Sequence, residues 1–477
     1  MKNMNNKKNL LKVVCLLIVT TGLLVLANLP ATQAQTGNAI LFEGARLIVG
    51  DGSAPIENSA FMVENSRFTK IGRKGAIQPP AGALRVDLTG KTVMPAMIDT
   101  HEHLGMTRED YIDQLNRVAF AGIAVTTSMG RDSEAAYPVR AEQPPNGAQF
   151  LTCGRGLVGP LGIKPETVAA GANGRLPEDL ADPAYPVATE EQARIDVREL
   201  ALKRVDCVKI WVDDRLGTEV PMKPEVYRAI IDEAHKHNLR VFAHMWYLDD
   251  AKNLARAGVD SFAHPIRDKE VDDELVQLLK DRPNIIMQTN LSSTEFLSLT
   301  EEPAWLQDPL LQDLASPAEI KKLSAQIHDK TTRIHEGWPA NISRVEFGRR
   351  TYGIMVRNTA KLYKAGVPYA VGTDAGGPTR GFSYHVELEL LVKDVGLTPS
   401  QVITMATRDS ARALHLDDLG TVAPGKIAAF LVLDANPLDD ITNTRRISKV
   451  YLRGHEINRA TVKAAIQASW NAHRASE

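Results

Sequence analysis

Two histidines separated by one residue make up the most chemically suggestive segment of the chain. The segment, Asp99-Thr100-His101-Glu102-His103, directly follows an apolar run that ends at Ile98. Alternate side chains of an extended segment point to the same side, so the imidazoles of His101 and His103 can bind one cation. A single pair of histidines at this spacing also arises by chance, so a metal site requires further ligands.

Further candidate ligands follow other apolar runs. They are Lys209, His244, His264 and Asp374. Each lies at the end of a predicted strand, and barrel enzymes place their chemistry at the carboxyl ends of their strands. An unpaired ammonium among apolar strand residues is costly, so Lys209 needs a chemical reason for its position.

The elements that must position these residues are predicted from hydrophobic periodicity. From residue 93 to about residue 416, short apolar runs alternate with amphipathic helical stretches, which is typical of βα units and a parallel sheet. Eight strands are predicted, with ends near Ile98, Thr127, Thr152, Ile210, Ala243, Ala263, Thr289 and Gly372. The connections over residues 154–188 and 290–350 are long enough to build a substrate pocket.

The two flanking segments have a different texture. Residues 37–92 and 420–465 alternate short apolar runs with turns, which predicts short antiparallel strands. Neither segment can bury a good core alone, so we expect them to meet in one small β-sandwich.

The first 34 residues predict a secretory signal. Four lysines precede an apolar run over residues 16–29, and Ala31-Thr32-Gln33-Ala34 offers a cleavage site. The run is short for a spanning helix, so we expect a periplasmic or secreted protein without stable membrane insertion. Removing those four lysines takes the formal net charge from −2 to −6, which argues against nucleic-acid binding. Cys153 and Cys207 are then interpreted as buried strand thiols.

Four segments resemble, in order, blocks of the amidohydrolase superfamily. They are Pro95-Ala96-Met97-Ile98-Asp99-Thr100-His101-Glu102-His103, Gly122-Ile123-Ala124-Val125-Thr126-Thr127, Gly372-Thr373-Asp374-Ala375 and Ala406-Thr407-Arg408-Asp409-Ser410-Ala411. The chain is most similar to the binuclear branch of prolidase-like and imidazolonepropionase-related enzymes. The resemblance implies an α/β fold: a (β/α)8 TIM-type barrel over residues 93–416 and a composite β-sandwich from residues 35–92 and 417–477, the last with a tail helix.

The resemblance also implies a ligand set. His101 and His103 would hold the more buried of two divalent cations together with Asp374, and zinc is the first candidate metal. His244 and His264 would hold the more exposed cation. Lys209, carboxylated by carbon dioxide, would bridge the two cations as a carbamate. A hydroxide shared by the cations would attack, with Asp374 as general base and acid, and His264 is a second catalytic candidate.

Six residues are candidate substrate contacts: Arg131, Arg215, Trp246, Tyr247, Arg267 and His385. The three arginines follow predicted strands and could bind a substrate carboxylate, or each could pair with the aspartate next to it in sequence. The two aromatic residues could line the pocket or pack a lid. The histidine could lie near the pocket or cap a helix.

The leading interpretation is an exported hydrolase that cleaves a carbon–nitrogen bond in an amide, a dipeptide or a cyclic amide of a small-molecule substrate. Hydrolysis of a lactone, an ester or a phosphotriester would use the same site. A mononuclear deaminase fits less well, because it would dispense with Lys209 and place a carboxylate beside His244. A non-catalytic exported metal-binding barrel is the alternative outside enzymes, and a homo-oligomer is expected by analogy alone.

Overall fold

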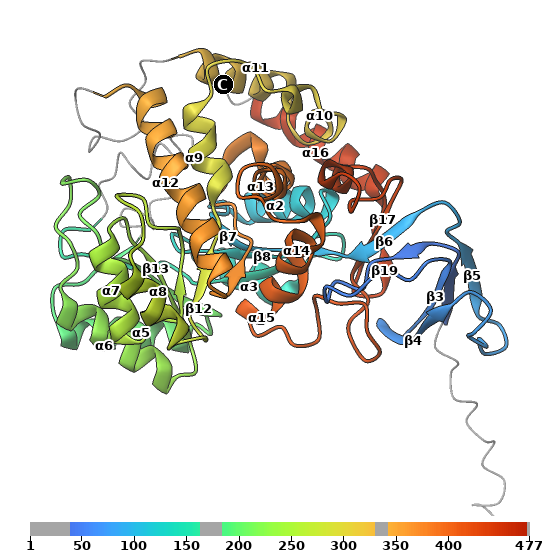
Figure 1. Cartoon of the computed structure of the whole chain (residues 1–477), viewed down its shortest axis with the longest axis horizontal. Helices are drawn as coiled ribbons and strands as arrows, with labels where there is room; N and C mark the ends of the chain where they lie inside the picture. The colour runs from blue at the N-terminus through green and yellow to red at the C-terminus, as the bar shows by residue number, and fades with distance from the viewer. Residues whose placement is uncertain (1–38, 163–183, 330–341, 475–477) are drawn as a thin grey trace, which may run out of the picture.

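Parallel strands occupy the middle of the chain. The computed structural model describes residues 39–162, 184–329 and 342–474 (Figure 1). One parallel sheet has the order β7(Met97–Glu102), β8(Ile123–Ser128), β9(Gln149–Thr152). A second has the order β11(Tyr185–Pro186), β10(Leu157–Val158), β12(Cys207–Trp211), β13(Arg240–His244), β14(Ser261–Phe262), β15(Ile286–Gln288), β16(Tyr369–Ala370).

Backbone hydrogen bonds connect the two parallel sheets at both of their ends. Thr100 in β7 donates from its backbone N to the carbonyl oxygen of Val371, just after β16, over 3.0 Å. At the other end, the backbone N of Asp206, just before β12, donates to the carbonyl oxygen of Thr152 in β9 over 2.8 Å. The strand ends lie within four residues of the predicted ones, and the largest difference is at β7, which continues past Ile98 to Glu102.

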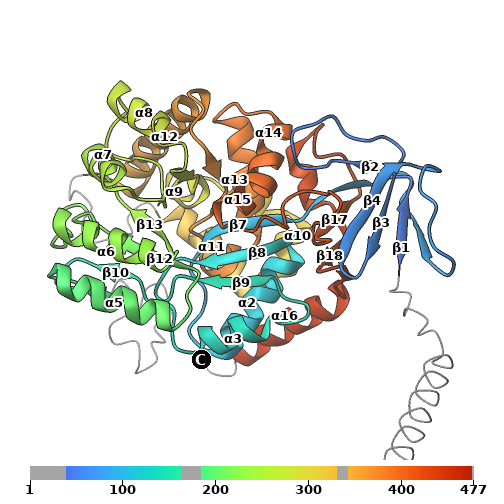
Figure 2. The same ribbon diagram turned by 90° about the horizontal axis from the view of Figure 1, so that it is seen from below.

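Helices surround these strands in both views (Figures 1 and 2). They are α2(Arg108–Phe120), α3(Ala136–Glu142), α5(Glu190–Leu202), α6(Pro224–Lys236), α7(Leu248–Ala257), α8(Asp273–Lys280), α9(Leu291–Ser298), α10(Pro309–Leu314), α11(Pro317–His328), α12(Arg344–Lys364), α13(Phe382–Lys393), α14(Pro399–Thr404), α15(Ser410–Ala413) and α16(Arg459–Arg474). Local sequence explains their starts: the Thr189 side chain accepts from the backbone N of Gln192 at the start of α5, and Pro224 opens α6. Within the described ranges, no helix combines the length and apolarity needed to cross a bilayer.

The first and last described segments share a sheet at one end of the molecule (Figures 1 and 2). Its order is β19(His455–Glu456), β18(Ile447–Leu452), β17(Phe430–Leu433), β6(Thr92–Pro95), β2(Arg46–Leu47). A second sheet has the order β4(Arg67–Arg73), β3(Ser59–Glu64), β1(Ile40–Glu43), β5(Leu84–Asp87). Most of these pairs are antiparallel, as the sequence predicts, but β1 with β5 and β2 with β6 are parallel.

Aromatic packing explains why segments so distant in sequence meet. Phe430 stacks on Tyr451 with 4.4 Å between ring centres, and Phe42 stacks on Phe61 at 4.9 Å. Phe42 also meets Phe430 edge to face at 5.2 Å. Each buried aromatic side chain contributes roughly 1.5–3 kcal/mol of hydrophobic free energy, so this cluster stabilises the pairing of the two chain segments.

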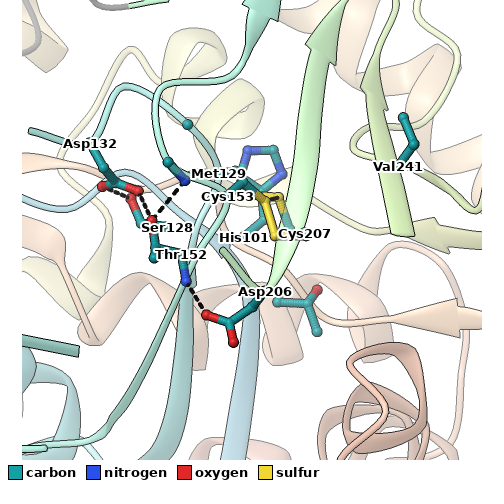
Figure 3. Close-up of a disulfide and its surroundings, with 12 residues drawn as sticks. His101, Ser128, Met129, Asp132, Thr152, Cys153, Asp206, Cys207 and Val241 are labelled. Atoms are coloured by element: carbon teal, nitrogen blue, oxygen red, sulfur yellow. Dashed lines mark hydrogen bonds between the residues drawn. A yellow bond between two sulfur atoms is a disulfide. The ribbon is translucent and has the colours of Figure 1, made fainter. Parts of the chain in front are cut away.

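A disulfide joins Cys153 and Cys207, so the interpretation of these residues as free thiols is wrong (Figure 3). The two cysteines are 54 residues apart in sequence, yet their Cα atoms lie 4.5 Å apart. The cause is the lateral contact of β9 with the start of β12, which sequence spacing does not reveal. The Asp206 carboxylate supports the same junction by accepting from the backbone N of Thr152 over 2.9 Å.

Three predicted features lie partly or wholly outside the described residues. The secretory signal over residues 1–34 is outside entirely. Residues 163–183 of the first long connection and 330–341 of the second are also outside, while the rest of the second connection forms α9, α10 and α11 and leads into α12.

Candidate metal centre

His101, His103 and Asp374 converge where β7 and β16 end. His101 lies within β7, His103 directly follows it, and Asp374 lies in the segment after β16. Nε2 of His101 is 3.4 Å and Nε2 of His103 is 3.2 Å from Oδ1 of Asp374. One potential ligand atom from each residue lies within 4.8 Å of the others, which suits a single cation.

The contact made by Nδ1 of each histidine determines which ring nitrogen can bind a metal. Nδ1 of His101 is 3.1 Å from the carbonyl oxygen of Ala263, and Nδ1 of His103 is 3.3 Å from that of Gly130. Carbonyl oxygens only accept, so Nδ1 carries the proton and Nε2 presents a lone pair to Asp374. Facing acceptors repel unless a cation or a proton lies between them, so this donor set fits a divalent ion.

His244 and His264 extend the group from the ends of β13 and β14. The ring centres of His244 and His264 are 4.6 Å apart, and those of His101 and His264 are 5.0 Å apart. Nδ1 of His264 is 3.8 Å from Oδ2 of Asp374. The structure therefore brings together all four histidines and the aspartate that the sequence singled out.

Lys209 completes this set from β12. Its side chain is fully buried, and Nζ has no hydrogen-bond partner among the described residues. The pKa of Lys209 is lowered from 10.5 to about 7, and burial is the main cause. Three nearby arginines lower this pKa further, and Asp374 opposes them by raising it. A large fraction of Lys209 is thus an uncharged amine at neutral pH, which is the form that combines with carbon dioxide.

Burial also keeps the imidazoles neutral. It lowers the pKa of His103 to about 4 and the pKa values of His244 and His264 well below the ordinary value for histidine. Burial alone raises the pKa of Asp374, but a proton held between its carboxylate and the rings of His101 and His103 stabilises the ionised form and keeps that pKa well below 3.8. Neutral imidazoles beside an ionised carboxylate are the protonation states that bind a cation.

Several supporting residues were missed by the sequence analysis. Asp99 accepts from the backbone N of His101 over 3.0 Å and from Thr373 Oγ1 over 2.8 Å. Arg380 donates from Nε to the buried Glu102 carboxylate over 3.0 Å and from Nη2 to the carbonyl oxygen of His103. These contacts fix the backbone that carries both histidines. Asp99 and Glu102 belong to the histidine segment itself, so their position there was an available signal.

Asp213 is a further carboxylate that the sequence analysis did not select. It lies just past the end of β12, and its Oδ2 is 3.1 Å from Nε2 of His244. Nη2 of Arg267 is 3.4 Å from the same ring nitrogen and 2.9 Å from the carbonyl oxygen of Met245. The His244 side of the group therefore carries one acidic and one basic neighbour.

The candidate arginines stand around this group, and among the described contacts none pairs with the aspartate next to it in sequence. The guanidinium of Arg131 lies over the Trp211 ring at 5.6 Å, and Nε of Arg215 pairs with Glu219 at 3.1 Å. Arg267 lies over the Trp246 ring at 4.3 Å. The neighbouring aspartates are bound elsewhere: Asp132 accepts from Tyr111, Asp214 from Tyr247, and Asp268 from the backbone N of Leu248.

Trp246, Tyr247 and His385 have well-defined surroundings. Trp246 stacks on Phe347 of α12 at 5.7 Å, and the Tyr247 hydroxyl donates to Asp214 over 2.8 Å. His385 is buried in α13, and its two ring nitrogens lie 2.9 Å from Thr444 Oγ1 and 2.9 Å from the carbonyl oxygen of Ala121. The structure does not bring His385 to the histidine group, and its contacts match a structural role.

Neutral imidazoles, a carboxylate and a buried lysine at the carboxyl ends of parallel strands are the arrangement of a metal-dependent hydrolase. The chain belongs to the amidohydrolase family, whose family model matches residues 92–457. The protein is therefore a hydrolase that acts on carbon–nitrogen bonds in small-molecule substrates, in a family that uses divalent metals.

Individual comparisons agree with this family. An imidazolonepropionase of Deinococcus radiodurans is 24% identical over 416 residues, covering 84% of this chain and 92% of that protein. The structure is similar to a Xaa-Pro dipeptidase with bound methionine, with a TM-score of 0.68, 20% identity, and coverage of 88% and 99% of the two chains. It is also similar to an ochratoxinase of A. niger, with a TM-score of 0.66, 18% identity and coverage of 88% and 96%. The two structural likenesses show a shared fold.

Proposed function

We propose that the chain is an exported metal-dependent hydrolase that cleaves the carbon–nitrogen bond of an amide, a dipeptide or a cyclic amide. One observation carries the proposal: two histidines with free Nε2 lone pairs face the Asp374 carboxylate at 3.2–3.4 Å, and Nζ of Lys209 has no hydrogen-bond partner among the described residues. The names of the related imidazolonepropionase and Xaa-Pro dipeptidase support a carbon–nitrogen bond in a small molecule.

Two divalent cations fit the donor set, and zinc is the first candidate because imidazole and carboxylate oxygen are good zinc ligands. His101, His103 and Asp374 would hold one cation, and His244 and His264 the other. Lys209, as its carbamate, would contact both. When bound, such cations lower the pKa of water and polarise a carbonyl group.

The chain's own residues supply the proton transfers. Asp374 is ionised at neutral pH because its pKa is held well below 3.8. Its carboxylate can take a proton from the attacking water and deliver it to the leaving nitrogen. His264, 3.8 Å from Oδ2 of Asp374, is placed to orient that carboxylate. Arg131 and Arg267 stand beside the group and can bind a substrate carboxylate.

The finer description of the fold is part of the proposal. The order β7, β8, β9, β12, β13, β14, β15, β16, with hydrogen bonds at both junctions, supports a (β/α)8 TIM-type barrel over residues 93–416. The pairing of β17 with β6 supports a composite β-sandwich from residues 35–92 and 417–477. In such a barrel the histidine group would lie at the carboxyl-end mouth.

Export to the periplasm or the exterior is also proposed. The disulfide between Cys153 and Cys207 supports it, because stable disulfides persist in oxidising compartments and are rare in the cytosol. The signal predicted over residues 1–34 supports the same location.

Activity and metal content measured together test the proposal. The purified protein is assayed against dipeptides, N-acyl amino acids, lactones and organophosphates, before and after treatment with a chelator, and its metal is measured by mass spectrometry. We expect hydrolysis of at least one amide, loss on chelation and recovery with zinc. Hydrolysis of lactones or organophosphates alone would contradict the proposed cleavage of a carbon–nitrogen bond. Full activity in metal-free protein would reject the metal.

A further inference from the structure

Two half-buried arginines beside the metal centre have no carboxylate within ion-pair distance among the described residues. Arg131 has no side-chain hydrogen bond or ion pair among the described residues, and its Nε is buried. Arg267 bonds only to neutral groups, the carbonyl oxygen of Met245 and the ring of His244. Asp374 acts on both guanidiniums and Asp213 acts on Arg267, but neither carboxylate pairs with them directly, so both arginines keep an Nε–H group that no described residue binds.

Several other arginines in the described ranges pair with a carboxylate. Arg140 pairs with Asp206 and Arg380 with Glu102, so in each case a carboxylate neutralises the guanidinium. Even Arg215, which stands beside the metal centre, pairs with a carboxylate at 3.1 Å. Arg131 and Arg267 differ from these. Arg344 also bonds only to carbonyl oxygens, but Arg131 and Arg267 stand beside the metal centre, where a substrate must bind.

The two arginines occupy opposite sides of the histidine group. Arg131 directly follows Gly130, whose carbonyl oxygen contacts Nδ1 of His103. Arg267 contacts His244, the histidine at the other side. The scissile bond must lie between these sides, next to Asp374, so each arginine can reach a different half of the substrate.

Rigid packing holds Arg131 in place. Its backbone has a φ of +67°, a conformation that side chains rarely adopt, and its backbone N donates to the carbonyl oxygen of Arg155 over 3.0 Å. Its guanidinium lies over Trp211. Gly130 and Gly156 each allow Trp211 to approach, because a Cβ at either position would lie 2.6 Å from its ring. The backbone and the aromatic support thus fix the charge before any ligand binds.

We infer that the substrate is a dicarboxylate amide, with one carboxylate on the acyl side and one on the amine side of the scissile carbon–nitrogen bond. One guanidinium binds each carboxylate. This inference rests on the proposed function for the position of the scissile bond. It defines a substrate class such as an amino acid acylated by a dicarboxylic acid, or a dipeptide with an acidic first residue and a free C-terminus.

Three compounds of matched length test the inference. N-succinyl-alanine carries both carboxylates, N-butanoyl-alanine lacks the acyl-side carboxylate, and N-succinyl-ethylamine lacks the amine-side carboxylate. Binding is measured by calorimetry on the full mature chain with Asp374→Asn, and turnover on the wild-type protein. We expect N-succinyl-alanine to bind at least about tenfold more tightly than either monoanion, with an affinity that falls as salt is added.

Variants assign each carboxylate to an arginine. Arg131→Met and Arg267→Met should each abolish the preference for one carboxylate, about a tenfold loss, and keep the preference for the other. Arg131→Lys keeps the charge without the planar fork and should lose less. Arg228→Met, on the exposed face of α6, is the matched control and should bind as the parent does.

The outcomes separate the inference from the proposed function. Equal binding of the three compounds, or Arg131→Met and Arg267→Met that behave like Arg228→Met, overturns the inference even if amides are hydrolysed. Selective binding of N-succinyl-alanine without hydrolysis of any amide rejects the proposed function and supports the dicarboxylate site.

Discussion

Replacing Lys209 by methionine should stabilise the metal-free protein at pH 7 and remove the activity of the metal-loaded protein. In the folded chain the pKa of Lys209 is lowered from 10.5 to about 7 by burial. That lowering corresponds to about 5 kcal/mol, at 1.36 kcal/mol for each pH unit. The unfolded chain takes up a proton as the pH falls below 10.5, whereas the folded chain does so only near pH 7, so stability is lost as the pH falls through this window.

The assay is denaturant unfolding of chelated protein in buffer free of carbon dioxide, at pH 7 and at pH 10. The free energy of unfolding of Lys209→Met minus that of wild type should be about 4 kcal/mol larger at pH 7 than at pH 10, which means that the variant is the more stable protein at pH 7. The comparison between two pH values cancels any difference in packing between lysine and methionine. Lys321→Met, at an exposed position of α11, is the control and should show no such difference.

A Lys209→Met protein that is less stable than wild type by the same amount at both pH values would refute this reasoning. That result would mean that Nζ has a favourable partner in the folded protein and is not held as a free amine. Metal content provides a separate readout. The variant should retain fewer than two bound metal ions per chain and should therefore lose activity.

Three further predictions concern residues around the metal centre. Asp374→Asn should lower kcat by roughly a hundred- to ten-thousand-fold with the fold retained by circular dichroism, and an unchanged kcat would exclude it as proton carrier. Replacing Cys153 and Cys207 by serine should cost about 4 kcal/mol of stability in urea, because the disulfide closes a 54-residue separation; an unchanged midpoint would contradict this. Burial raises the pKa of Asp132 from 3.8 to about 7, so the unfolded chain releases its proton at a lower pH than the folded chain does. The free energy of unfolding of wild type should therefore fall by about 4 kcal/mol relative to that of Asp132→Asn as the pH rises from 4 to 7. Stability profiles of the two proteins that run parallel over this pH range would contradict the prediction.

Local sequence signals placed the parallel strands well because those signals act over a few residues. A buried parallel strand needs a continuous apolar run, and such runs end close to where β8, β9 and β12 end. The end of β7 was misplaced because polar residues from Asp99 to Glu102 continue the strand. Hydrogen bonds from Thr373 and Arg380 satisfy their buried carboxylates, and those partners come from distant parts of the chain.

Contacts between distant segments of the chain could not be predicted as well from the sequence. The sequence offered His385 as a possible pocket residue, yet Thr444 and the carbonyl oxygen of Ala121 occupy its ring. It also offered Asp132 as an alternative partner for its neighbour Arg131, but Asp132 accepts from Tyr111 and Ser128. Adjacent residues in a loop point in different directions, so closeness in sequence is a poor guide to ion pairing.

The sequence by itself determined which residue types end the strands: the histidines, Lys209 and Asp374 each follow an apolar run, and hydrophobic periodicity is a local property. Only the tertiary structure decided which ring nitrogens are free, that Cys153 meets Cys207, and that Nε of Arg131 and of Arg267 has no hydrogen-bond partner among the described residues. Those facts depend on orientation and on neighbours from distant segments, and packing of the whole chain sets both.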